Sequence, residues 1–161
     1  MGYPNDLLST RAIVKHGRYA VIPPEGRVKN VIPNLEQCNV SIIASPHYGP
    51  QFAMYTVEVL PGGGTVKPFQ EEGIETFVYC ISGQGEVTVD GEVYNVDESG
   101  YVFAPASMGM GLKNNSDTPW QLLLYKQRYR PLEGHEARVV VGRLNDMPDA
   151  PYDGMENVSP F

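Results

Sequence analysis

The stretch EEGIETFVYCISGQGE (residues 71–86) decides the fold of this chain. Within it, TFVYCIS (76–82) is a nearly continuous apolar run of strand length, a pattern typical of a strand buried on both faces. Gly83 and Gly85 follow the run and end it. We therefore predict a central β-strand over residues 76–82.

The rest of the sequence is rich in short strand patterns. In GEVTVDGEVYNV (85–96), Asp90-Gly91 predicts a β-hairpin, because its tight turn needs two residues that tolerate positive φ. The run FAMYTVEVL (52–60) predicts a strand that ends at the glycine-rich PGGGT (61–65). Other strand-like runs are VSIIAS (40–45), YVFAP (101–105), GMGLKN (109–114), WQLLLYKQR (120–128) and HEARVVVG (135–142). Many short strands at regular spacing predict an all-β antiparallel sandwich or barrel.

The length, composition and net charge of the chain restrict its fold and the kinds of molecule that it can bind. The 161 residues suit one domain, and the 17 glycines and 14 prolines suit short strands joined by turns. A net charge of −7 argues against nucleic acid and anionic membranes, because both would repel the chain. A small molecule or another protein is the expected partner. The N-terminal MGYPNDLLST (1–10) lacks the pattern of a secretion signal, and Cys38 and Cys80 are expected to be reduced and at least partly buried, so we expect a cytoplasmic protein.

The segment FVYCISGQGEVTVDGEVYNVDESGYVFAPASMGMGLKNN (77–115) resembles a cupin. It has a strand ending in Ser-Gly, a short glycine turn, a hairpin, and Gly-x-x-x-x-Pro leading into a second motif strand. The resemblance implies a double-stranded β-helix, a jelly-roll-like antiparallel barrel. Metal-bearing cupins carry two histidines and a carboxylate in the first motif and one histidine in the second. Such clusters hold one cation and leave open positions for substrate.

The residues at the metal-ligand positions differ in this chain. The motif's carboxylate falls on Thr76, and its histidine pair falls on Gln70 and Glu72. The histidine of the second motif falls on Met110. A hydroxyl, an amide, one carboxylate and a thioether suit a divalent cation poorly. We therefore expect no metal and no cofactor in this barrel, and interpret the four residues as degenerate motif positions that line its pocket.

The cupin pattern also divides the chain into three parts. Residues 40–142 contain the strand runs and are predicted to form the cupin barrel. Residues 1–39 alternate short apolar pieces with proline and glycine, and predict an arm of short strands that packs on the barrel. Residues 143–161 are acidic and contain prolines, and are predicted to be either a tail or the start of a truncated second cupin.

Four further segments resemble the (S)-ureidoglycine aminohydrolase family: RAIVKHG (11–17), VKNVIP (28–33), EGIETFVYCISG (72–83) and LYKQRYRPLEG (124–134). The resemblance implies a two-cupin enzyme of allantoin and purine breakdown, which converts ureidoglycine to ureidoglycolate and ammonia. It also implies that manganese and the catalytic groups belong to the second cupin. The leading hypothesis is therefore a metal-less N-terminal cupin that is catalytically incomplete alone, and no catalytic residue is assigned in this chain.

Two alternatives stay open. One is a stand-alone, non-catalytic cupin that binds a small acidic metabolite or acts as an oligomerisation domain. Lys126, Arg128 and Arg130 alternate along one face of a strand-like run, and are predicted to contact either an anion or a neighbouring domain. The other is a metal-dependent enzyme with the unusual ligands Glu71, Glu72 and Glu75.

Phe77 and Tyr79 lie opposite Val78 and Cys80 on the predicted central strand. A strand that is apolar on both faces needs cover on both sides, and large aromatic side chains bury much area when covered. We therefore expect either a homo-oligomer or packing against a second cupin domain.

Overall fold

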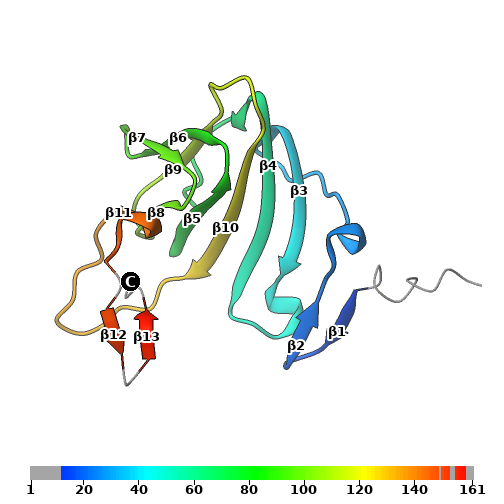
Figure 1. Ribbon diagram of the computed structural model, residues 1–161, viewed down its shortest axis with the longest axis horizontal. Helices are drawn as coiled ribbons and strands as arrows, with labels where there is room; N and C mark the ends of the chain where they lie inside the picture. The colour runs from blue at the N-terminus through cyan, green and yellow to red at the C-terminus, as the bar shows by residue number, and fades with distance from the viewer. Residues whose placement is uncertain (1–11, 149, 153–154, 159–161) are drawn as a thin grey trace, which may run out of the picture.

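The computed structural model describes residues 12–148, 150–152 and 155–158. Nine strands form one antiparallel sheet in the order β11-β8-β5-β10-β4-β9-β6-β7, with β3 paired to β4 (Figure 1). β7 approaches β5 and β8 at the far end of this order, so the sheet curls into a nearly closed barrel. The strands are β3 (Leu35–Ala44), β4 (Phe52–Thr65), β5 (Ile74–Ser82), β6 (Gln84–Val89), β7 (Glu92–Asp97), β8 (Gly100–Ala104), β9 (Met110–Lys113), β10 (Trp120–Arg128) and β11 (Val140–Arg143). The predicted all-β antiparallel barrel is confirmed.

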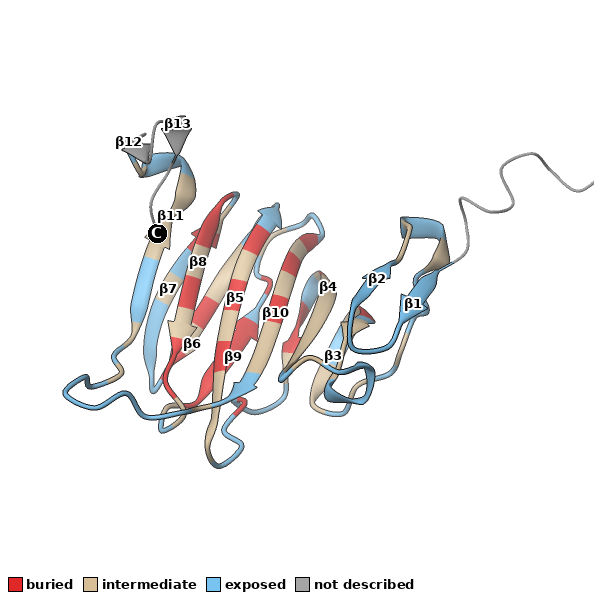
Figure 2. Cartoon of the chain, turned by 90° about the horizontal axis from the view of Figure 1, so that it is seen from below, coloured by how far each residue is buried: buried red, intermediate tan, exposed pale blue. Residues whose placement is uncertain are grey.

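The core comes from the inward face of alternating residues. On β5, Val78 and Cys80 are fully buried, whereas Phe77 and Tyr79 on the other face are half-buried. Figure 2 shows the same alternation as bands along β5 and β10. Trp120 at the start of β10 is fully buried, and its indole Nε1–H donates to Cys80 Sγ at 3.2 Å. Both cysteines are free thiols, as predicted.

β4 corrects the prediction that PGGGT (61–65) ends a strand. The strand continues to Thr65, and Gly64 pairs with Lys113 of β9. Gly64 has φ +151°, and a Cβ there would lie 2.1 Å from the carbonyl oxygen of Leu112. Only glycine allows this close approach, so the glycines bend β4 from one half of the barrel into the other instead of terminating it.

The Asp90-Gly91 hairpin is confirmed. Asp90 has φ 46° and Gly91 has φ 91°, as a tight turn between β6 and β7 requires. The Asp90 Oδ1 atom also accepts a hydrogen bond of 2.8 Å from the backbone N–H of Gly109. The hairpin turn is therefore tied to the loop that leads into β9.

The predicted arm and tail contain short elements of their own. β1 (Ile13–Lys15) and β2 (Tyr19–Val21) form an exposed two-stranded sheet, and a 3₁₀ turn spans Pro24–Gly26. Residues 1–11 of the arm lie outside the described residues, and β3 begins at Leu35, inside the segment assigned to the arm. A second 3₁₀ turn, Pro46–Tyr48, joins β3 to β4.

The segment predicted to be a tail begins inside β11. It continues through a 3₁₀ turn, Leu144–Asp146, into a small antiparallel sheet of β12 (Ala150–Tyr152) and β13 (Met155–Val158). Arg143 pairs with Asp97, which fastens the end of β11 to β7. No helix within the described ranges has the length and hydrophobicity that crossing a membrane requires.

Gly85 provides a test of the core packing. A Cβ at Gly85 would lie 2.4 Å from the Trp120 ring, so we expect Gly85→Ala to lower the free energy of unfolding by about 1–3 kcal/mol through overpacking. Gly111→Ala is the matched control, because its Cβ would meet its nearest neighbour at an ordinary 3.5 Å. Urea unfolding followed by tryptophan fluorescence measures both variants. Equal stabilities for the two would contradict this packing.

Candidate functional site

A depression of about 660 Å³ opens at one end of the barrel, and we call it the barrel mouth. A smaller cavity of about 30 Å³ adjoins it and reaches inward to Val40 and Leu124. The mouth is formed by the arm, by β4 and β10, and by the loop between β4 and β5. Its lining residues are Ile32, Pro33, Asn34, Tyr55, Lys67, Pro68, Phe69, Gln70, Glu71 and Lys126.

Lys126 is the central charged group of the mouth. It follows Leu122 and Leu124 on the inward face of β10, so the strand alternation directs it toward the interior. Its Nζ lies 2.5 Å from Glu71 Oε1 and 3.8 Å from the centroid of the Phe69 ring. The Lys126 side chain is 16% exposed, whereas that of Glu71 is 55% exposed. The ammonium is thus held between a carboxylate and an aromatic face, both of which favour a cation.

Burial and charge act together on the titration of these groups. Burial lowers the pKa of Lys126, and the hydrogen bond and charge of Glu71 only partly offset this effect. For Glu71, burial would raise the pKa, but the hydrogen bond from Lys126, a hydrogen bond from the Glu71 backbone and the Lys126 charge together outweigh it, so the pKa of Glu71 lies below its ordinary value. Burial, with a smaller contribution from the Glu71 charge, raises the pKa of Tyr55. Tyr55 therefore keeps its proton and can donate a hydrogen bond at neutral pH.

The degenerate motif positions lie in different surroundings. Thr76 is the cross-strand partner of Lys126 and is buried. Gln70 is exposed and lines the mouth. Met110 is fully buried in the core, where its backbone exchanges hydrogen bonds of 2.7 and 2.9 Å with Phe69. Glu72 is exposed and is not part of the lining of the mouth, so of these four residues Gln70 alone both lines the mouth and reaches solvent.

These side chains do not fit the manganese ion that the family resemblance implies for a cupin enzyme. The mouth offers the Gln70 amide, the Tyr55 hydroxyl and a single carboxylate, Glu71, which is paired with the Lys126 ammonium, and this ammonium would repel a divalent cation. Within the described ranges, no three His, Cys, Asp or Glu side chains come together as a metal site. We therefore derive no chemical step through a metal in this barrel.

The carboxylates of the alternative metal hypothesis have separate roles. Glu71 pairs with Lys126, Glu72 is exposed, and burial raises the pKa of Glu75. Glu75 and Gln127 are cross-strand partners between β5 and β10. Sequence reasoning considered Glu71 as a metal ligand and missed its pairing with Lys126. The sequence did contain a signal for this pairing. Lys126 follows Leu122 and Leu124 at every second position of the strand, so it is expected on the inward face, where it needs a counter-charge.

Lys126, Arg128 and Arg130 differ in burial. Lys126 is inside the mouth, whereas Arg128 is exposed at the last position of β10. Arg130 lies beyond the strand and is exposed. The predicted anion or interdomain contact through these residues stays a prediction. Lys126 is largely buried, whereas the two arginines are exposed to solvent.

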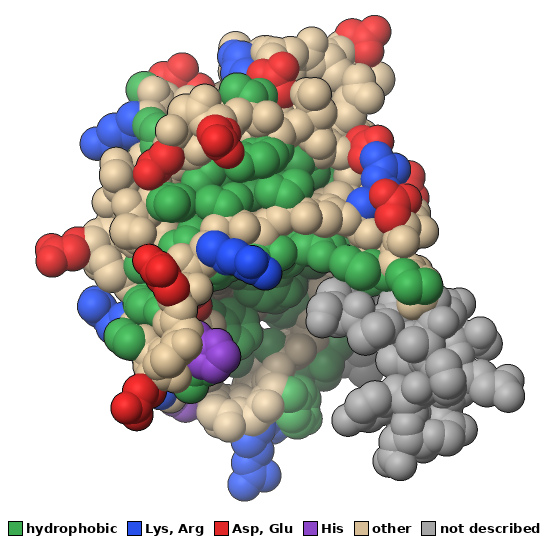
Figure 3. All heavy atoms as spheres, turned by 90° about the vertical axis from the view of Figure 1, so that its left-hand side faces the viewer, with side chains coloured by type: hydrophobic (Ala, Val, Ile, Leu, Met, Phe, Trp, Pro, Cys, Tyr) green, Lys and Arg blue, Asp and Glu red, His purple; other side chains and the backbone are tan. Residues whose placement is uncertain are grey.

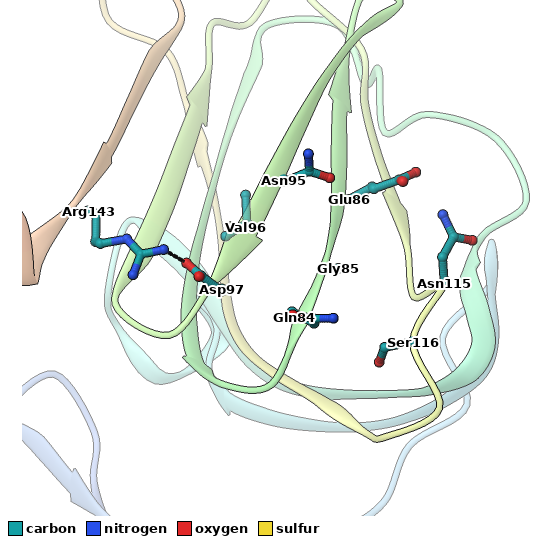
Figure 4. Close-up of a pocket in the computed structure, with 9 residues that line it drawn as sticks. All are labelled: Gln84, Gly85, Glu86, Asn95, Val96, Asp97, Asn115, Ser116 and Arg143. Carbon is teal, nitrogen blue, oxygen red and sulfur yellow. Dashed lines mark hydrogen bonds and ion pairs between the residues drawn. The ribbon is translucent and has the colours of Figure 1, made fainter.

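A second depression, of about 400 Å³, lies beside the β6–β7 hairpin (Figure 4). Its polar lining includes Gln84 and Glu86 on β6, Asn95 on β7, and Asn115 in the loop before β10. At one side Arg143 points at Asp97 and pairs with it. The charged groups here are thus partly neutralised by each other, and sequence analysis did not identify this depression.

Comparisons with known proteins agree with the barrel geometry. A family profile described as "Cupin domain" matches residues 55–125, which run from β4 through β10. The chain has a cupin fold. It is 40% identical over 157 residues to the (S)-ureidoglycine aminohydrolase of Escherichia coli K12, an overlap of 98% of this chain and 60% of that protein. A rice protein named "Probable (S)-ureidoglycine aminohydrolase" is 25% identical over 140 residues, 86% of this chain and 44% of that protein.

A solved structure extends the likeness beyond the profile. The crystal structure of the Escherichia coli protein YlbA matches this cupin with a TM-score of 0.84 and 40% identity, over 92% of this chain and 61% of that one. The sequence resemblance to the (S)-ureidoglycine aminohydrolase family is confirmed by these matches. The chain spans less than two thirds of the length of each of these relatives.

The Lys126–Glu71 pair predicts a pH dependence of stability. Because the folded-state pKa of Glu71 is depressed, its stabilisation is present above its unfolded pKa of about 4.3 and is lost as pH falls through the lower folded-state pKa. We expect Glu71→Gln to lower the free energy of unfolding at pH 7 by at most about 1 kcal/mol, because Glu71 is half exposed.

Urea unfolding at pH 7 and pH 3 measures this difference, which should shrink toward zero at the lower pH. Glu72→Gln is the matched control, since Glu72 is exposed and makes no ion pair among the described residues. A Glu71→Gln deficit that persists at pH 3 would show that the side chain stabilises the fold by packing and not by charge.

Proposed function

We propose that this cupin is the N-terminal half of an (S)-ureidoglycine aminohydrolase. The observation that carries the proposal is the 40% identity to the Escherichia coli enzyme, which runs over 98% of this chain and 60% of that protein. An overlap of nearly the whole of this chain with part of a longer enzyme is what a domain of that enzyme would give. The reaction, ureidoglycine to ureidoglycolate and ammonia, belongs in this proposal to the whole enzyme.

The chemistry of the barrel mouth supports different roles for the two cupins of the proposed enzyme. Lys126 carries a positive charge where metal-bearing cupins would hold a cation, and Met110 is sealed in the core. This barrel therefore contributes a folded partner, while manganese and the groups that release ammonia would lie in the other cupin of the enzyme. The side chains of this barrel orient and support that cupin without touching the reacting atoms.

The outer face of the sheet supports packing against a partner. A row of rings crosses four neighbouring strands, with centroid separations of 6.0 Å for Phe52–Tyr125, 5.9 Å for Tyr125–Phe77 and 6.0 Å for Phe77–Tyr101. All four residues are half-buried in the isolated chain. Apart from this row, Figure 3 shows hydrophobic side chains on the side of the molecule where β7, β8 and β11 lie in Figure 1. Faces of this kind are usually covered by another domain or subunit.

A chimera tests the proposed function directly. This chain would replace the aligned part of the Escherichia coli enzyme, and ammonia release from (S)-ureidoglycine would be measured with added manganese. We expect activity from the chimera, and neither activity nor stoichiometric manganese by elemental analysis from this chain alone. A folded but inactive chimera would contradict the proposal. Ammonia release by this chain alone, with one metal ion per chain, would instead make this barrel the active site.

The aromatic row predicts the association state of the isolated chain. Without the second cupin, we expect the row to be covered by another copy, and Phe77→Ser with Tyr125→Ser to weaken this association at least about tenfold. Light scattering coupled to size exclusion measures the mass at several concentrations. Val93→Ser is the control, because Val93 is 58% exposed on β7 and lies outside the row. A wild-type chain that stays monomeric would contradict the expectation.

A further inference from the structure

The barrel mouth has a surplus of positive charge. Its lining contains two lysines, Lys67 and Lys126, against one carboxylate, Glu71. The whole chain has a net charge of −7, so this local sign is opposite to that of the rest of the molecule. A concave site with a local positive surplus attracts anions, and the apolar walls around it strengthen the attraction by excluding water.

Glu71 already shows which kind of anion fits. Its carboxylate oxygen lies 2.5 Å from Lys126 Nζ, on a loop residue whose side chain is 55% exposed. On its other side the ammonium faces the Phe69 ring, at 3.8 Å. A carboxylate can therefore reach Lys126 from the solvent side of the mouth. In this structure that carboxylate is Glu71 of the same chain.

Breaking the Lys126–Glu71 ion pair costs the two side chains different amounts of free energy, because they differ in exposure. Lys126 is largely buried and needs a counter-charge, because a desolvated ammonium without a partner is unfavourable. Glu71 is mostly in solvent, so it regains hydration readily when it leaves. An exchange of Glu71 for another carboxylate would keep Lys126 neutralised throughout.

We propose that the barrel mouth is a binding site for a small carboxylic acid, with Lys126 as its anchoring cation and Glu71 as an internal stand-in that the ligand displaces. This site requires no metal ion. The inference does not depend on the aminohydrolase proposal, since a non-catalytic barrel can bind a ligand through the same residues.

Other groups of the mouth restrict the ligand further. The Tyr55 hydroxyl and the Gln70 amide line the same depression as Lys126, and none of the hydrogen bonds among the described residues uses either side-chain group. Ile32, Pro33 and Pro68 supply apolar wall. The volume of about 660 Å³ lies in the range of small-molecule pockets. A short acid with one polar substituent, such as a 2-hydroxy acid, satisfies the ammonium and the two neutral polar groups together.

The test uses glycolate as the probe and glycolamide as its uncharged equivalent of similar size. Two-dimensional NMR titration at low ionic strength measures the dissociation constant for the wild-type chain. We expect glycolate to shift the amide signals of Phe69, Gln70 and Glu71, and glycolamide to leave them unchanged. Glu71→Gln should bind glycolate at least about threefold more tightly, because the internal competitor is gone. Lys126→Met should bind it at least about tenfold more weakly, because the charged anchor is lost.

Arg138→Gln is the matched control, since Arg138 is exposed and does not line the mouth, and it should bind glycolate like the wild type. Lys126→Gln repeats the loss of charge if Lys126→Met fails to fold by circular dichroism. Equal glycolate affinity in the wild type and the Lys126 variant would overturn the proposal, as would no gain in Glu71→Gln. Inorganic phosphate that binds as tightly as glycolate, and with the same dependence on Lys126, would overturn the assignment to carboxylic acids.

Discussion

The close approach of two backbones at Gly64 is the constraint on which the barrel depends. In the strand order, β4 is the single connection between the β11-β8-β5-β10 half and the β9-β6-β7 half. Gly64 is the residue of β4 that pairs in register with β9, and its missing Cβ is what lets the Leu112 carbonyl approach. Gly62 and Gly63 add backbone hydrogen bonds of 2.9 Å to Asn114, directly after β9. A side chain there would push the two halves apart. The core that Trp120, Val87 and Leu112 share could then no longer close, because these residues come from both halves.

The same bend determines where the mouth opens. β4 ends at Thr65, and the chain between it and β5 then passes over the end of the barrel. Phe69 is held in this connection by two backbone hydrogen bonds to Met110 of β9. The aromatic ring beneath Lys126 is thus positioned by the backbone, and Glu71 follows two residues later on the same connection. A lysine from β10 and a carboxylate from the connection meet because β4 has already brought the two halves together.

Local chemistry explains what sequence analysis could predict. The Asp90-Gly91 turn is set by the backbone preferences of the two residues themselves, and the alternation of Val78 and Cys80 with Phe77 and Tyr79 follows from strand geometry. The role of Gly64 was misjudged because it depends on Leu112, a neighbour in space that no local pattern indicates. Glu71 was misjudged for a similar reason. A carboxylate in a loop can serve a metal, a lysine or solvent, and only the position of Lys126 decides between them.

The Lys126–Glu71 contact has a consequence for the concentrations at which the mouth can respond. Glu71 is attached to the barrel through a short connection, so its carboxylate is present near Lys126 at an effective concentration on the order of millimolar. A free acid that binds Lys126 no better than the Glu71 carboxylate does must exceed that local supply before it occupies half of the mouths. Trace metabolites would leave the contact closed, whereas an acid that accumulates in the cell would open it. The tether therefore raises the apparent dissociation constant of the mouth for a free acid, by a factor that the protein's own geometry sets.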